Sequence, residues 1–200
     1  MPRDVNLVSE AAEMGNTEVM SKLAPQGARI SVLFSAGEIA TRVRELATEI
    51  VATMGPEPLV IPVLKGSFIF AADLLRALHE EGAEPDMDFI SLSSYGKGTQ
   101  SLGEVRILRD TEADIEGRDV LIIDDILESG RTLAFAKDLM MARRARSVRT
   151  CVLLDKPGKL AVQMKADFVG FKCADRFVVG YGMDVAHAYR QLPFVGVVES

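Results

Sequence analysis

The stretch Val120–Leu133 reads VLIIDDILESGRTL. Its first four residues are apolar without alternation, a pattern typical of a strand that is buried on both faces of a parallel sheet. Two acids, Asp124 and Asp125, follow directly, and Gly130 lies in a short turn before a helical pattern over about 132–144. Ligands of open α/β sheets bind beyond the carboxyl ends of the strands. This stretch therefore predicts both a central strand and a ligand site at its end.

The turn after this strand has the chemistry of a phosphate site. Free backbone N–H groups at the start of a helix and the helix dipole both favour an anion. Gly130 lets the backbone come close to a ligand, and the hydroxyls of Ser129 and Thr132 can donate to phosphate oxygens. Acids beside a phosphate are expected if they bind sugar hydroxyls or a bridging Mg²⁺. The alternative is that Asp124 and Asp125 only cap a helix at the surface.

The sequence on both sides of this stretch alternates strands with helices. Ser35 and Glu38 have the spacing of a capping box before apolar residues at helical spacing up to Ile50. A second helical pattern passes through residues 70–78. Strands are expected at residues 59–64, 88–93, 104–108, 120–123 and 147–154. The alternation predicts an α/β fold, with a mainly parallel twisted sheet flanked by helices.

The two ends of the chain depart from this rhythm. Residues 1–29 show little periodicity and predict an N-terminal extension. Residues 30–200 are expected to form one domain, with a core over about 35–155. A small C-terminal hood lobe is expected over about 156–200, because only short strand-like runs, Asp167–Phe171 and Phe177–Val179, occur there.

Composition limits the classes of protein and the partners. The 200 residues carry a formal net charge of −6, which argues against a protein that coats nucleic acid. No apolar run approaches the roughly 20 residues of a membrane span, and the first ten residues lack the apolar core of a secretory signal. Two cysteines, Cys151 and Cys173, are too few for a disulfide framework. We therefore expect a cytoplasmic protein without nucleic-acid or membrane partners.

The sequence contains one basic cluster, Arg143-Arg144-Ala145-Arg146, with Arg149 close by. Such a cluster is usually the solvated end of a helix, where cations also complement the helix dipole. A protein interface and an RNA contact are the less favoured alternatives.

Four motifs together resemble the hypoxanthine (guanine) phosphoribosyltransferases, within the type I phosphoribosyltransferase family. VLIIDDILESGRTL resembles the motif that binds phosphoribosyl diphosphate (PRPP) throughout that family. Three further motifs narrow the resemblance: Val63-Leu64-Lys65-Gly66-Ser67 followed by FIFAADLLRAL, Ser93-Ser94-Tyr95-Gly96, and LLDKP with FVGF and FVVGYGMD downstream. The likeness runs from about Ile30 to Glu199.

The resemblance implies a purine salvage enzyme. Such an enzyme transfers the 5-phosphoribosyl group from PRPP to N9 of hypoxanthine and/or guanine, giving IMP or GMP and pyrophosphate. In such enzymes the reaction passes through a ribosyl cation-like state, with Mg²⁺ holding the pyrophosphate. Nearby negative groups stabilise the positive charge that develops at C1′, and the highly charged leaving group needs cations. The resemblance also implies small-molecule partners, PRPP and a 6-oxopurine base, and a homodimer or homotetramer. The alternatives are an RNA-binding regulator on the same fold and a transferase that prefers xanthine or guanine alone.

The resemblance assigns roles to the residues of the central motif. Asp124 and Asp125 match the acidic pair that holds the ribose hydroxyls and helps organise the metal. Glu128 occupies the position of the family's catalytic aspartate, which takes or holds the proton at purine N7, and glutamate adds one methylene. The residues matched to the cradle for the 5′-phosphate are Glu128, Ser129, Gly130, Arg131 and Thr132.

The remaining roles come from the other motifs. Lys65 and Gly66 match a loop that contacts pyrophosphate, in which the peptide bond before the lysine can be cis. Lys156 matches the lysine that donates to the purine 6-oxo group, with a solvated surface lysine as the alternative. The other matches are Phe177 stacked on the purine, Val178 at the base edge, Asp184 as a metal-binding aspartate, Arg190 reaching pyrophosphate, and Ser94 and Tyr95 in a mobile loop. For Phe177, packing in the core is the alternative.

Overall fold

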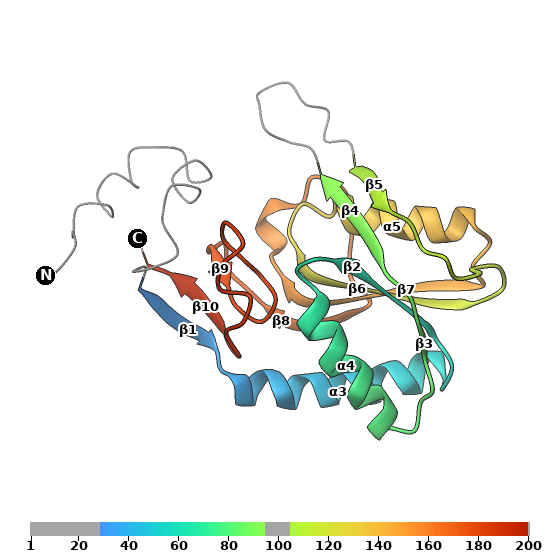
Figure 1. Cartoon of the computed structure of the whole chain (residues 1–200), viewed down its shortest axis with the longest axis horizontal. Helices are drawn as coiled ribbons and strands as arrows, with labels where there is room; N and C mark the ends of the chain where they lie inside the picture. Colours follow the sequence, from blue (N-terminus) through green and yellow to red (C-terminus); the bar gives the residue numbers. More distant parts are fainter. Residues whose placement is uncertain (1–28, 95–104, 200) are drawn as a thin grey trace, which may run out of the picture. The chain divides into compact units, whose positions relative to one another are not determined.

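The computed structural model of the chain describes residues 29–94 and 105–199 (Figure 1). Of the predicted N-terminal extension, residues 1–28 lie outside this description, and so does Tyr95 of the expected mobile loop. The described residues divide into two compact units, one over Gly37–Asp175 and one formed by the segments on either side of it.

The larger unit holds the predicted α/β fold (Figure 1). Its helices are α3 (Ala36–Met54, from Gly37 on), α4 (Phe68–Glu80), α5 (Arg131–Ala142) and the 3₁₀ turn η1 (Pro157–Lys159). Its strands are β2 (Leu59–Leu64), β3 (Asp86–Met87), β4 (Ile90–Ser94), β5 (Val105–Arg109), β6 (Asp119–Leu127), β7 (Ser147–Asp155) and β8 (Phe168–Lys172). The strand order is β5-β4-β2-β6-β7-β8, with β3 beside β2. All pairs are parallel except β4 with β5.

Strand β6 lies at the centre of this sheet, as its sequence predicts. The side chains of Val120, Leu121, Ile122 and Ile123 are fully buried. The strand does not end at Ile123, however: it continues to Leu127 because β7 keeps pairing with it, from Asp124 opposite Val152 to Leu127 opposite Asp155. The two acids are therefore part of the strand.

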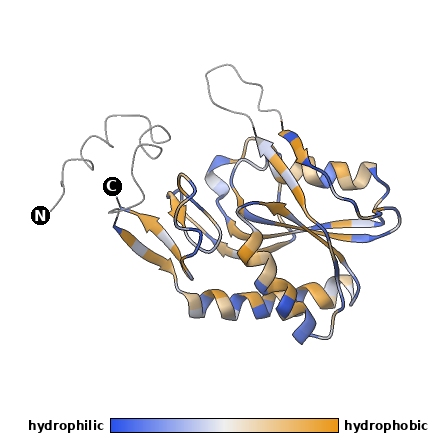
Figure 2. Ribbon diagram, in the orientation of Figure 1, coloured by the Kyte–Doolittle hydropathy of each residue, from blue (hydrophilic) through white to orange (hydrophobic). Residues whose placement is uncertain are grey.

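Helices cover both faces of the sheet, and α5 lies on the opposite side from α3 and α4 (Figure 1). The apolar stripe of α5 packs with Leu59, Ile61, Val120 and Ile122 in one hydrophobic cluster. These strand residues are spaced by two, as expected for one face of a sheet. Figure 2 shows how the apolar residues gather along the central strands and on one side of each helix.

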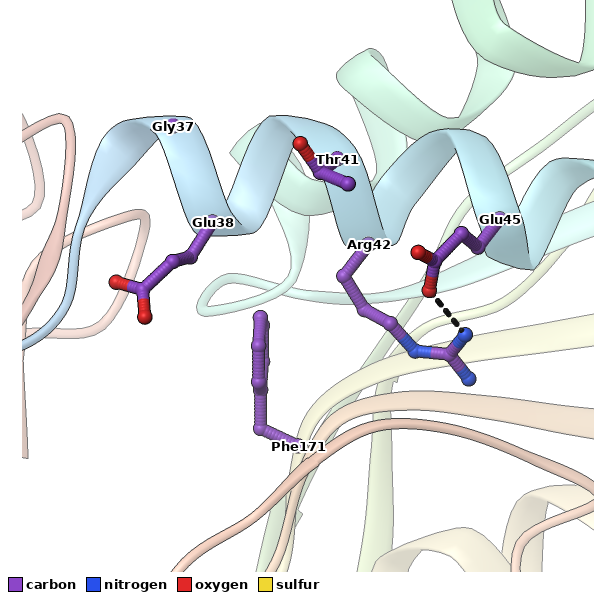
Figure 3. A pocket seen from close by; sticks show the side chains of 6 residues that line it. All are labelled: Gly37, Glu38, Thr41, Arg42, Glu45 and Phe171. Carbon is purple, nitrogen blue, oxygen red and sulfur yellow. Dashed lines mark hydrogen bonds and ion pairs between the residues drawn. The ribbon is translucent and has the colours of Figure 1, made fainter.

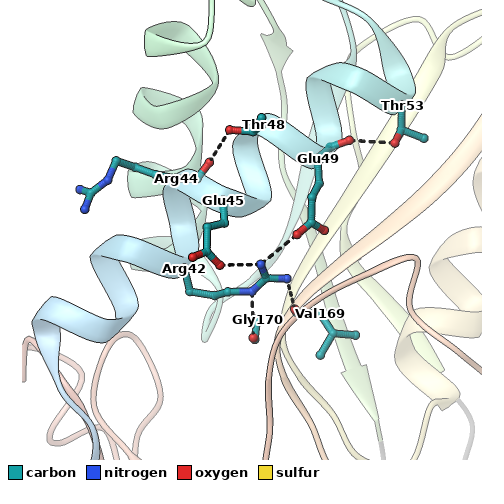
Figure 4. A network of polar contacts seen from close by, with 8 residues as sticks. All are labelled: Arg42, Arg44, Glu45, Thr48, Glu49, Thr53, Val169 and Gly170. Atoms are coloured by element: carbon teal, nitrogen blue, oxygen red, sulfur yellow. Dashed lines mark hydrogen bonds and ion pairs between the residues drawn. The ribbon is translucent and has the colours of Figure 1, made fainter.

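Arg42 fastens α3 to the edge strand β8. Its Nε donates to the carbonyl oxygen of Gly170 over 3.1 Å, and its second terminal nitrogen donates to that of Val169 over 2.9 Å. Glu45 and Glu49, each 2.9 Å from the other terminal nitrogen, hold the guanidinium in place (Figure 4). Backbone groups at the edge of a sheet are otherwise open to pairing with another chain, so Arg42 protects this edge.

An open hollow of about 390 Å³ lies beside this contact (Figure 3). It is lined by Gly37, Glu38, Thr41, Arg42, Glu45 and Phe171.

The smaller unit is an antiparallel sheet in the order β1-β10-β9. Its strands are β1 (Ile30–Phe34), β9 (Val178–Val179) and β10 (Val195–Val198). The division falls between Asp175 and Arg176, whereas we expected a hood from about residue 156. The difference arises because β8 pairs with β7 and so joins the larger sheet, and because β1 pairs with β10 across the length of the chain.

Every arginine of the basic cluster is paired with an acid. Arg143 lies 2.6 Å from Asp110, Arg144 lies 2.9 Å from Glu116 and Arg149 lies 2.8 Å from Asp167, while Arg146 pairs with Asp119. The cluster is thus a charge-compensated surface.

No helix among the described residues is long and apolar enough to cross a membrane.

Candidate functional site

Three neighbouring strands end together at one edge of the larger sheet. Leu127 of β6 lies opposite Asp155 of β7, which lies opposite Lys172 of β8. The ladder continues for one more bond, since the Lys156 N–H donates to the Leu127 carbonyl over 2.9 Å. Parallel strands place their carboxyl ends at the same edge. Glu128 and Lys156 therefore leave the sheet side by side.

Asp124 is a buried acid whose side chain makes local contacts. The residue is only 8% exposed, and its Oδ1 accepts the N–H of Asp125 over 3.0 Å. Burial, followed by the neighbouring charge of Asp125, raises the pKa of the Asp124 carboxyl well above its usual value. The alternative that these acids only cap a surface helix is wrong, because both lie in a central strand.

Gly66 lies directly beside Asp125, the second of the two acids. Gly66 follows β2, which pairs directly with β6. A Cβ atom at this position would overlap Oδ2 of Asp125, so only glycine fits beside that carboxylate without displacing it. The peptide bond between Leu64 and Lys65 is cis, as the resemblance implies. The structure thus brings the predicted pyrophosphate loop next to the predicted ribose-binding acids.

The turn after β6 encloses a small polar cavity. The cavity measures about 160 Å³. Gly130, the residue directly before α5, has a φ of +77°, a left-handed conformation that favours glycine. The lining residues are Asp124, Ile126, Leu127, Glu128, Ser129, Gly130, Thr132 and Leu133.

A second loop packs over this turn. A Cβ atom at Gly130 would approach Met164, Val162 and Leu160 to between 3.0 and 3.3 Å. The Ala161 N–H donates to the Ser129 carbonyl over 2.9 Å. The Ser129 Oγ accepts the Arg131 N–H at 3.4 Å, while the side chain of Arg131 is exposed. The first turn of α5 still has N–H groups without partners inside the helix, as any helix start does, and these suit an anion.

Glu128 and Lys156 form the polar centre beside this cavity. The Lys156 Nζ lies 3.6 Å from Oε1 of Glu128. The Lys156 residue is only 5% exposed, so the alternative of a solvated surface lysine is wrong.

Sequence reasoning missed the next two members of this cluster. Lys159 Nζ also lies 3.6 Å from Oε1 of Glu128, and it lies 2.7 Å from Oδ1 of Asp175. The spacing of Lys156 and Lys159 could have indicated Lys159, because residues three apart in a single 3₁₀ turn lie on the same side of it.

The smaller unit holds the other predicted residues. Asp184 Oδ1 lies 2.6 Å from Arg190, whose other terminal nitrogen donates to the Gly182 carbonyl. Four non-glycine residues of this loop have positive φ values, namely Tyr181, Ala186, His187 and Tyr189. Strained backbone of this kind clusters at functional sites. The structure thus pairs the predicted metal-binding aspartate with the predicted pyrophosphate-binding arginine.

Phe177 and Val178 differ in exposure. Phe177 is 41% exposed, so the alternative of a core residue is wrong, whereas Val178 is buried at the start of β9. Ser94, from the expected mobile loop, ends strand β4.

Comparison with known proteins agrees with this geometry. Residues 31–186 match the family model described as "Phosphoribosyl transferase domain". The chain is 46% identical to the hypoxanthine-guanine phosphoribosyltransferase of Bacillus subtilis over 169 residues, which cover 84% of this chain and 92% of that protein. It is 48% identical to the bifunctional protein TilS/HprT of Listeria innocua, but it spans only 26% of that longer protein.

A solved structure shows the same fold. A hypoxanthine-guanine phosphoribosyltransferase from Bacillus anthracis superposes with a TM-score of 0.80 at 42% sequence identity, covering 86% of this chain and 100% of that one. The fold, the motifs and the relatives agree, and the chain belongs to the phosphoribosyltransferase family.

Proposed function

We propose that this protein is a purine salvage enzyme that transfers the 5-phosphoribosyl group of PRPP to N9 of hypoxanthine and/or guanine. The observation that supports this most strongly is an arrangement along β6 and its neighbours. Buried Asp124 and partly buried Asp125 are followed by a small polar cavity with a left-handed glycine, and the Lys156–Glu128 pair lies beside it. The relatives carry the same activity in their names.

The larger unit offers a place for each part of PRPP. The first turn of α5 suits the 5′-phosphate, since its N–H groups and dipole favour an anion. Asp124 and Asp125 suit the ribose hydroxyls, because carboxylates accept hydrogen bonds from them. Lys65 and Gly66, beside Asp125, suit the pyrophosphate. In the smaller unit, Arg190 is proposed for the same group.

The reaction breaks the bond from C1′ to pyrophosphate and forms a bond from C1′ to N9. The pyrophosphate leaves with the electron pair, so positive charge develops at C1′, where nearby negative groups stabilise it. The proton at purine N7 passes to Glu128. Lys156 donates to the 6-oxo group, which fixes the base for attack. Phe177 and Val178 of the smaller unit are proposed to stack on the base and to contact its edge.

Mg²⁺ fits the acidic pair as a cofactor. Proteins hold this ion through one or two carboxylates and leave the remaining positions to water and substrate phosphates. The parts of the chain that the structure describes contain no group of three or more potential metal ligands. The proposed carboxylates are Asp124 and Asp125, with Asp184 for the same role in the smaller unit. The bound ion would neutralise charge on the pyrophosphate.

Pyrophosphate release from PRPP tests the function directly. Hypoxanthine, guanine and xanthine are supplied separately, each with Mg²⁺. Release with hypoxanthine, with or without release with guanine, is expected. Release with only xanthine or only guanine would identify the alternative base preference. No release with any base would contradict the proposal.

Two substitutions connect this activity to the site. Asp125→Asn and Lys156→Ala are expected to reduce kcat/KM by about 100-fold or more, because each removes a group that contacts substrate. Circular dichroism checks that both variants fold. Kinetics close to the wild type for both variants would show that the site lies elsewhere.

The RNA-binding alternative finds no support in the basic cluster, whose arginines are all paired with acids. A salt series with structured RNA would detect it as tight binding that weakens steeply with salt.

A homodimer or homotetramer and a cytoplasmic location stay predictions. Light scattering tests the oligomeric state.

A further inference from the structure

Glu128 lies between two lysines. Its Oε1 is 3.6 Å from Nζ of Lys156 and also 3.6 Å from Nζ of Lys159. The resemblance gave Lys156 a role toward the base and gave Lys159 none. The two lysines differ in burial, since the Lys156 side chain is 7% exposed and that of Lys159 is 49% exposed.

Local geometry brings the two lysines to one side of their turn. Lys156 precedes the 3₁₀ turn Pro157–Lys159, and residues three apart in a 3₁₀ turn lie one above the other. Lys156 is fixed by its backbone bond to Leu127 at the end of β6. Lys159 is therefore directed toward the residue that follows β6, which is Glu128.

A half-exposed lysine normally has a mobile side chain, and Asp175 restrains this one. The distance from Lys159 Nζ to Asp175 Oδ1 is 2.7 Å. This hydrogen bond, together with nearby Glu128, raises the pKa of Lys159 and keeps its ammonium group charged. Asp175 lies just beyond β8, so the cluster joins segments that follow three neighbouring strands.

We propose that Lys159, held by Asp175, is a positioning residue that fixes the Glu128 carboxylate for proton transfer from the base; this inference rests on the proposed function. The extra methylene of glutamate gives the carboxylate reach and one more rotatable bond. Lys159 limits that freedom by providing a second cationic contact to the oxygen that Lys156 also contacts. A shorter aspartate would withdraw the carboxylate by about 1.5 Å, one carbon–carbon bond, from Lys159.

Lys159→Met in the full chain tests this role, because methionine keeps the apolar stem and removes the charge. The expected result is a fall in kcat of about three- to tenfold, with the KM for PRPP within about twofold of the wild type. Lys159→Arg is expected to recover most of the lost kcat, since it restores the cation. Lys165→Met, at an exposed position in the same connection between β7 and β8, is the matched control and is expected to match the wild type.

A double-mutant cycle separates action through Glu128 from action on the substrate. In a Glu128→Asp background, the further change Lys159→Met is expected to alter kcat by less than about twofold, because the shorter carboxylate no longer reaches the lysine. An equal loss of kcat in both backgrounds would overturn the proposal, as would a failure of arginine to restore activity.

A crystal structure of Lys159→Met provides a test without turnover. The Glu128 side chain is expected to leave its position between the two lysines or to lose defined density. An unchanged Glu128 position would overturn the inference even if the enzyme were active. Absence of activity in the wild type would instead contradict the proposed function, so the two failures can be told apart.

Discussion

Asp124 is a site residue that lowers the stability of the folded protein when its carboxyl is ionised. A carboxylate in a central strand, next to a second carboxylate, has lost its water and faces a like charge, and both effects favour its protonated form. A bound cation or sugar hydroxyls would offset the free energy needed to ionise this buried carboxyl. Without ligand, the folded protein bears this cost whenever the acid is ionised.

Asp124→Asn is therefore expected to increase the free energy of unfolding at pH 7.5, by about 1 kcal/mol or more, while lowering activity. The folded pKa lies above the unfolded value near 3.9, so the folded state binds more protons in this range and its stability falls as pH rises above about 4. Asparagine cannot ionise, so its advantage over the wild type should grow from pH 5 to pH 7.5. Urea unfolding without Mg²⁺ at both pH values measures this, and a constant difference would contradict it.

Gly66 offers a second prediction for a single residue. Gly66→Ala is expected to displace the Asp125 carboxylate and to lower kcat/KM for PRPP by about 100-fold, because small misplacements at a reacting centre cost large rate factors. Gly37→Ala is the matched control, since a Cβ there meets nothing within 4 Å. Equal kinetics for the two variants would show that the contact with Asp125 has no role in substrate binding.

At the scale of the element, strand β8 depends on helix α3. Two carbonyls of this edge strand accept hydrogen bonds from Arg42, and that guanidinium is in turn held by two glutamates of its own helix (Figure 4). Helix α3 thus covers the sheet with its apolar stripe, and it also satisfies two backbone carbonyls of the edge strand β8.

Arg42→Met is expected to lower the free energy of unfolding by about 1–3 kcal/mol, because two partly buried carbonyl acceptors lose a charged donor. Amide exchange in β8 should accelerate more than in the central strand β6. Arg44→Met, an exposed change in the same helix, is the control and should have little effect. The prediction fails if both variants unfold at the same urea concentration.

At the scale of the whole molecule, ion pairs between arginines and aspartates make the free energy of unfolding depend on pH in the acidic range. The hydrogen bond from Arg146, aided by that from Ser147, lowers the pKa of Asp119, and Arg143 does the same for Asp110. Acids with lowered folded pKa values stabilise the protein above the unfolded pKa, and this contribution is lost as pH falls through the folded value. These pairs therefore stabilise the fold above about pH 4.

Asp119→Asn tests this at the start of β6. The difference in unfolding free energy between the wild type and this variant is expected to shrink as pH falls from about 5 to about 2, because protonation removes the wild type's advantage. Asp138→Asn, at an exposed position of α5, serves as the control. A difference that stays constant over this range would contradict the assignment.

Local signals explain what the sequence could predict. The unbroken apolar run of β6, the glycine at the turn and the capping pair before α3 act over a few residues, so each of these elements could be predicted. The continuation of β6 through two aspartates could not, because aspartate disfavours strands and only the pairing with β7 keeps it there. The boundary at Asp175 and the pairing of β1 with β10 likewise depend on partners far away in the sequence.

The pairing of β1 with β10 also has a consequence for how the chain acquires its structure. Ile30 meets Val198, with the whole larger unit inserted between the two halves of the smaller sheet. An unfolded insert would oppose this pairing through the entropy of closing a very long loop, whereas a folded insert removes most of that entropy. We therefore expect the larger unit to fold first, which shortens the loop between β1 and β10. The smaller sheet should form last, and it should be the first part to open when denaturant is added.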